Sequence, residues 1–162
     1  MQAFERELLT LLPRLRRFAR SLTRDAADAD DLTQMALERA LKAKAQWQPG
    51  TRMDSWMLKI MRNSWIDEVR SRTRRARTLA PEEEGLVTVA SPDDAFEQAA
   101  EADSIGRAMG ELPTEQREVI ALVLVDGLSY REAADVLDIP IGTLTSRLTR
   151  GRQALARKLE AA

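Results

Sequence analysis

Two short helical patterns separated by a tight break, within residues 114–158, restrict the possible fold of this chain more than any other feature. The first pattern covers residues 129–137 and opens with Ser129, followed three residues later by Glu132. A serine and a glutamate at this spacing form a capping box at a helix start. Pro140 lies in the break, where it ends one helix and favours the start of the next. The pattern predicts two helices joined by a short turn.

The second of these helices has two different sides. At about 100° per residue, Leu144, Leu148 and Leu155 share one side. The opposite side carries Ser146, Thr149, Arg150 and Gln153. Residues 147–158 hold five basic side chains and no acidic one, and a one-signed polar stripe suits phosphate contacts. We expect a helix-turn-helix whose second helix enters the DNA major groove; a helical hairpin with a solvated basic face is the alternative.

Charge is segregated along the chain, so the net charge of -1 over 162 residues hides the pattern. Residues 70–77 contain five arginines and no acid, whereas residues 78–104 contain eight acids and no base. A basic segment next to an acidic one fits a nucleic-acid binder better than the overall balance suggests.

Cysteine and histidine are both absent, which excludes disulfides and Cys/His zinc sites. The first 22 residues are amphipathic and interrupted by charges, unlike a signal peptide, and we expect them to form one continuous helix. No apolar run reaches 18 residues, so we expect no membrane insertion and a cytoplasmic protein.

The breakers divide the chain into three parts. Residues 1–77 and 101–162 are helical in pattern, and residues 78–100 combine prolines, a glycine and acidic side chains. We therefore expect an all-α fold of two small helical domains joined by a flexible linker, which lets the domains move independently.

In the first domain, an acidic cluster at residues 27–31 precedes an expected helix over residues 32–44. Acids before a helix are favourable against its dipole, so capping explains the cluster; a metal site is the weaker alternative. A second helix is expected over residues 57–75, with Leu58, Met61, Trp65 and Val69 on one line. The three tryptophans fit a core, although aromatics beside basic residues also suit single-stranded nucleic acid.

Three segments together resemble a known family. These are ADADDLTQMALERAL (27–41), WQPGTRMDSWMLKIMRNSWIDEVR (47–70) and the stretch from LPTEQ to RQAL (112–155). In order and spacing they resemble regions 2 and 4 of the extracytoplasmic-function (group IV) sigma factors, members of the sigma-70 family of bacterial RNA polymerase subunits. The resemblance implies a domain for core docking and -10 recognition and melting at 1–77, an acidic linker at 78–100, and a -35-reading domain at 101–162.

The resemblance also implies site residues. Core polymerase would be bound by Asp30, Asp31, Gln34, Leu37, Glu38 and Leu41. The -10 element would be bound by Arg52, Met53, Lys59, Asn63, Asp67, Arg70 and Arg74, with Arg52, Met53 and Asn63 lining a pocket for a flipped base. The -35 element would be bound by Thr143, Thr145, Ser146, Arg147, Thr149 and Arg150. Many relatives carry Lys or Arg in place of Thr145, which leaves the -35 sequence open.

The implied partners are the polymerase core, through the beta-prime clamp helices and the beta flap, promoter DNA and an anti-sigma factor. No cofactor, metal or catalytic residue is implied. The run Glu82–Glu84 would lie in the RNA exit path and imitate nucleic acid, or simply keep the linker soluble. Three rivals remain: a stand-alone helix-turn-helix regulator, a helical adaptor, and an enzyme such as a recombinase. The enzyme alternative is the weakest, because Tyr130 is the only tyrosine and no histidine is available as an acid or base.

Overall fold

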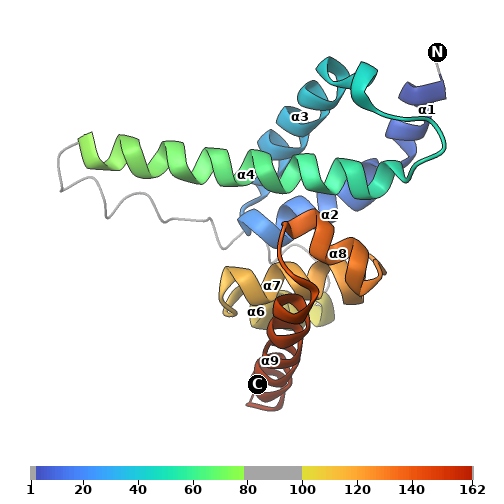
Figure 1. Ribbon diagram of the computed structural model, residues 1–162. Helices are drawn as coiled ribbons and strands as arrows, with labels where there is room; N and C mark the ends of the chain where they lie inside the picture. Colours follow the sequence, from blue (N-terminus) through green and yellow to red (C-terminus); the bar gives the residue numbers. More distant parts are fainter. Residues whose placement is uncertain (1–2, 79–99, 162) are drawn as a thin grey trace.

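The computed structural model describes residues 3–78 and 100–161, and within these ranges it is helical with no strand, as expected (Figure 1). The N-terminal bundle, residues 3–78, contains α1 (Ala3–Thr10), α2 (Leu12–Thr23), α3 (Ala26–Lys42), the short 3-10 turn η1 (Lys44–Gln46) and α4 (Met53–Thr78). The C-terminal bundle, residues 100–161, contains α6 (Ala100–Gly110), α7 (Thr114–Ile120), the π-helical turn η3 (Ala121–Val125), α8 (Tyr130–Leu137) and α9 (Ile141–Ala161). Most of the expected linker, including Glu82–Glu84, lies outside the described residues.

The first 22 residues form two helices, so the prediction of one continuous helix is wrong. The chain breaks at Leu11, and Pro13 lies in the first turn of α2. Proline has no N–H to donate and is tolerated there but not inside a continuous helix. α2 ends at Thr23, and the next residue, Arg24, has a left-handed φ of 63°.

α3 and α4 both begin earlier than expected. Asp25 caps α3 by accepting a hydrogen bond from the Ala27 N–H at 3.4 Å, so the acidic cluster lies inside the helix instead of before it. α4 starts at Met53, four residues before the predicted start. Acidic side chains are favourable throughout the first helical turn, which makes the sequence ambiguous about which residue begins the helix.

The core of the N-terminal bundle joins α2, α3 and α4. Leu15, Phe18, Leu32, Met57 and Met61 are almost completely buried. The three tryptophans are half-buried and pack against this core, as the sequence predicts. Phe4 of α1 contacts the edges of Trp47 and Trp56, with ring centroids 5.5 and 6.0 Å apart.

The helix-turn-helix is confirmed. The Ser129 hydroxyl accepts from the Glu132 N–H at 3.1 Å, and the Glu132 carboxylate accepts from the Ser129 N–H at 2.9 Å. Leu144 and Leu148 of α9 are buried, and Leu155 packs against the same core. Asp138 ends α8 in the left-handed conformation, with φ at 57°.

The two bundles are in contact, α8 lying against α4 and α7 against α2 (Figure 1). Arg117 of α7, which is buried, reaches across to α2 and donates to the Ser21 carbonyl at 2.6 Å. Burial lowers the pKa of Arg117, and the nearby charge of Arg24 acts in the same direction. The two bundles therefore form a closed arrangement, whereas the sequence predicts two domains that move independently.

Candidate nucleic-acid and partner interfaces

One face of α3 carries the six residues expected to bind a partner. Its opposite face buries Ala29, Leu32, Ala36 and Ala40 against the bundle core. The helical period therefore turns the six outward. Asp30, Asp31, Gln34, Glu38 and Leu41 are exposed, and Leu37 is half-buried. Leu41 is 48% exposed, so this acidic face also offers an apolar contact.

A polar cluster fixes this face relative to α4. The Arg72 guanidinium donates to both carboxylate oxygens of Asp28 at 2.8 and 3.1 Å and to Glu68 at 2.9 Å. It also lies 5.3 Å from the centroid of the Trp65 ring. The hydrogen bonds from Arg72 lower the pKa of Asp28. A hollow of about 380 Å³, lined partly by these side chains, adjoins the exposed face at Asp31, Gln34 and Glu38.

The residues expected to read the -10 element divide along α4. Asn63 is exposed near the middle of α4. Arg70 and Arg74 are exposed towards its C-terminal end, which extends beyond the other helices of the N-terminal bundle (Figure 1). Asp67 is exposed and pairs with Arg39 at 3.1 Å. Met53, expected to line a base pocket, is only 1% exposed, so no base reaches it in this arrangement.

The start of α4 contacts the C-terminal bundle. Arg52 forms an ion pair with Glu132 of α8, and Lys59 lies 3.9 Å from the Asp135 carboxylate. Arg62, which the sequence places simply on the surface, lies 3.4 Å from the buried Glu118 carboxylate and donates to the Leu137 carbonyl at 3.3 Å. Burial raises the pKa of Glu118, although Arg62 acts in the opposite direction.

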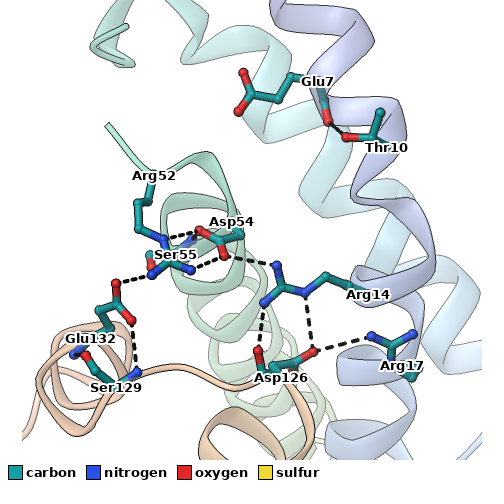
Figure 2. Close-up of polar contacts among 10 residues, drawn as sticks. All are labelled: Glu7, Thr10, Arg14, Arg17, Arg52, Asp54, Ser55, Asp126, Ser129 and Glu132. Carbon is teal, nitrogen blue, oxygen red and sulfur yellow. Dashed lines mark hydrogen bonds and ion pairs between the residues drawn. The ribbon is translucent and has the colours of Figure 1, made fainter. Parts of the chain in front are cut away.

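Arg14 and Asp54 extend this network (Figure 2). Arg14 donates to Asp54 at 2.9 Å and to the Asp126 backbone carbonyl at 3.1 Å, and Asp54 also accepts from Arg52 at 3.1 Å. Burial alone would raise the pKa of Asp54, but the hydrogen bonds from Arg52 and Arg14 lower it overall. Asp126 has a side chain only 1% exposed, and burial raises its pKa despite the charges of Arg14 and Arg17.

No local pattern indicated these contacts between the bundles. The capping-box pattern predicts Glu132 only as a cap, and no sequence pattern indicates a role for Arg14, Glu118 or Asp126. These residues are far apart in the sequence and close in space. Helical periodicity relates only residues of the same helix, so it cannot predict such pairs. The π-helical turn η3, which directly precedes Asp126, was also missed.

The polar face of α9 is largely exposed. Thr145, Ser146, Thr149 and Arg150 are exposed, as predicted, and Thr143 and Arg147 are half-buried. Arg147 lies 3.5 Å from Glu115 at the start of α7. The face thus combines short polar side chains with guanidinium groups, which together can contact base edges and phosphates.

Among residues 3–78 and 100–161, no group of three acidic side chains is placed to hold a metal ion. No helix in this described part of the chain is long and apolar enough to cross a membrane.

Comparison with known proteins gives consistent matches. Residues 8–75 match the family model for sigma-70 region 2, and residues 102–155 match that for sigma-70 region 4. The chain is 34% identical to the ECF RNA polymerase sigma factor EcfG of Rhodopseudomonas palustris, over 93% of this chain and 81% of that protein. It is 37% identical to the ECF RNA polymerase sigma factor SigC of Mycobacterium tuberculosis, over 81% of this chain and 70% of that protein.

Among solved structures, the chain is similar to the sigma factor RpoE from Bartonella quintana, solved in complex with the anti-sigma factor NepR. The TM-score is 0.85 at 32% identity, covering 99% of this chain and 98% of the other. It is also similar to CnrH in complex with the cytosolic domain of CnrY, with a TM-score of 0.66 at 27% identity, covering 98% and 88%.

Proposed function

Because this chain belongs to the extracytoplasmic-function RNA polymerase sigma factors, we propose that its exposed helix faces divide the work of promoter-directed initiation. The α3 face binds the polymerase core, α4 reads and helps open the -10 element, and α9 reads the -35 element. Residues 1–77 form the first unit, residues 101–162 the second, and residues 78–100 the linker between them. The observation that carries this division is that the α3 and α9 faces remain exposed while their opposite sides are buried.

The α3 face suits a basic partner surface with an apolar centre. Asp30, Asp31 and Glu38 supply negative charge, and Leu41 supplies exposed apolar area. Complementary charge speeds and orients association, while the apolar contact contributes binding free energy. The beta-prime clamp helices are the partner that we assign to this face, and the beta flap is assigned to the C-terminal bundle.

For α4, the exposed Asn63, Arg70 and Arg74 offer one amide for base contacts and two guanidinium groups for phosphates. Unstacking a base costs a few kcal/mol, which pocket contacts must offset. Arg52 takes part only when it is released from Glu132, and Met53 only when it becomes exposed.

For α9, Thr145, Ser146 and Thr149 face bases, and Arg147 and Arg150 face phosphates. A helix-turn-helix places its second helix in the major groove, where base pairs present distinct donors and acceptors. A stand-alone regulator would use the same helix, but it would leave the acidic face of α3 and the basic end of α4 without a role.

We also assign this chain an anti-sigma partner, since RpoE was solved in complex with the anti-sigma factor NepR. No catalytic role is assigned to any residue, and the place of action is the cytoplasm, where core polymerase and DNA meet.

Transcription of genomic DNA by purified bacterial core polymerase, with and without the chain, tests the proposal. Mapping RNA 5′ ends should give discrete start sites that depend on the chain. Specific nanomolar binding of a duplex promoter by the chain alone, with no effect on core polymerase, would favour the stand-alone regulator.

A further inference from the structure

The contacts between the bundles pair basic side chains of α4, and of the residue just before it, with acidic side chains of the C-terminal bundle. Three such pairs are Arg52–Glu132, Lys59–Asp135 and Arg62–Glu118, here called the interdomain latch. Arg52 directly precedes α4, Lys59 and Arg62 lie on it, and the carboxylates come from α7 or α8. Arg52 and Lys59 belong to the surface assigned to -10 DNA, so their carboxylate partners compete with phosphates for the same cations.

A cation that holds a carboxylate in a close ion pair is not free to hold a phosphate in the same place. Arg52 donates to Asp54 as well as to Glu132, so its guanidinium is held by two carboxylates (Figure 2). The start of α4 is therefore masked in the closed arrangement.

The other two surfaces are not masked. The exposed residues of the α3 face and the polar face of α9 are not drawn into the latch. In the closed arrangement, the exposed α3 and α9 faces can still bind polymerase and duplex DNA. Only the first half of the -10 surface is covered.

We infer that the latch makes the closed chain autoinhibited for -10 DNA, with α8 and Glu118 acting as an internal stand-in for the phosphate backbone. This rests on the proposed function of α4. If only a fraction of molecules is open, the apparent affinity for single-stranded DNA falls by that fraction. DNA and closure compete for the same cations, so single-stranded DNA shifts the chain towards the open state.

The double variant Glu132→Gln/Asp135→Asn weakens the latch without removing a helix cap. Glutamine at the third helical position still accepts from the Ser129 N–H, as glutamate does in a capping box. The control Glu111→Gln/Glu160→Gln changes the net charge equally but at two exposed sites, one directly after α6 and one in α9. Glu111 pairs with Lys158 at 3.4 Å, within the C-terminal bundle. Equal charge change in both variants removes non-specific attraction to DNA as an explanation.

Arg62→Ala provides a second variant for the conformation. It removes the ion-pair partner of the buried Glu118 carboxylate from the N-terminal bundle, which favours separation of the bundles. Because the chain contains no cysteine, a dye pair can be attached to cysteines placed at the exposed Ala45 and Ala156. Energy transfer between the dyes then reports closure independently of DNA binding.

The experiment measures energy transfer and the binding of a labelled, random-sequence single-stranded 20-mer by the full chain. The double variant should show lower energy transfer and about fivefold tighter DNA binding than the control, a size expected for two exposed ion pairs. Arg62→Ala should also lower energy transfer, and DNA should lower it in the unmodified chain.

Unchanged energy transfer in both variants would overturn the latch. Lower energy transfer with unchanged DNA affinity would overturn the masking. Neither result bears on the proposed function. The proposed function fails only if transcription with core polymerase gives no chain-dependent start sites.

Discussion

Glu132 uses its two carboxylate oxygens for two different tasks: one accepts from the Ser129 N–H at the start of α8, and the other pairs with Arg52 at the start of α4. The first contact sets a helix boundary, and the second joins the two bundles. The backbone hydrogen bond from Ser129 and the charge of Arg52 both lower the pKa of Glu132, so the residue remains ionised for both tasks near neutral pH.

The division of labour on α9 predicts two kinds of variant. Arg150→Ala should weaken -35 binding for all sequences and reduce the slope of log affinity against log salt by about one unit, because one phosphate contact is lost. Thr149→Ala should change the preference among sequences and leave the slope intact. Binding titrations at several salt concentrations distinguish the two; equal slopes in both variants would mean that α9 is oriented differently.

Charge reversal on α3 tests the docking face. Asp31→Arg should reduce binding to core polymerase at least tenfold with unchanged helicity, because the exposed side chain faces a basic partner surface in the proposal. Circular dichroism and a core-binding assay on the same sample measure both. Glu160→Arg, an equal change at an exposed site on α9, should bind normally. Full core binding by Asp31→Arg would place the docking surface elsewhere.

Gly151 marks a tight helix contact. A Cβ atom there would lie 2.9 Å from Ile120 Cδ1 and 3.3 Å from Gln116 Cβ, so Gly151→Ala should push α9 away from α7. Overpacking costs about 1–3 kcal/mol, against a gain of up to about 1 kcal/mol in helix propensity. Urea unfolding should show a net loss. Gly106→Ala in α6, with nothing within 4 Å, should instead be neutral or stabilising.

The buried carboxyl of Glu118 predicts a pH dependence. Burial raises its pKa, so the folded chain binds protons more tightly than the unfolded chain. The free energy of unfolding then falls as pH rises from the ordinary glutamate pKa through the raised one. Glu118→Gln should make this fall smaller in urea titrations above pH 4.5, whereas Glu111→Gln should not. Asp126 shifts in the same direction, so some dependence should persist. An undiminished fall in Glu118→Gln would contradict the assignment.

Local patterns predicted the local structure well. The capping box at Ser129 and the buried stripe of Leu144 and Leu148 follow from spacing along one helix, and both are present. Element boundaries were less predictable. Pro13 divides the first helical pattern, and α4 begins four residues early at Met53, because propensity alone does not decide where a helix starts.

Contacts between the bundles were beyond sequence reasoning. Arg62 and Glu118 are separated by 56 residues, and each fits an ordinary solvated helix face when considered alone. Only the packing of α7 and α8 against α4 and α2 makes them partners. The faces that suggest function are thus predictable from helical periodicity, but their accessibility in the closed chain is not.

The most direct test of the central claim is permanganate footprinting of a promoter found by start-site mapping. Permanganate oxidises unpaired thymines, so it reports strand opening at the -10 element. Core polymerase and the chain together should make thymines there reactive, and neither should do so alone. Reactivity with core polymerase alone, or no reactivity with both present, would contradict the account that this chain directs the polymerase to open promoters.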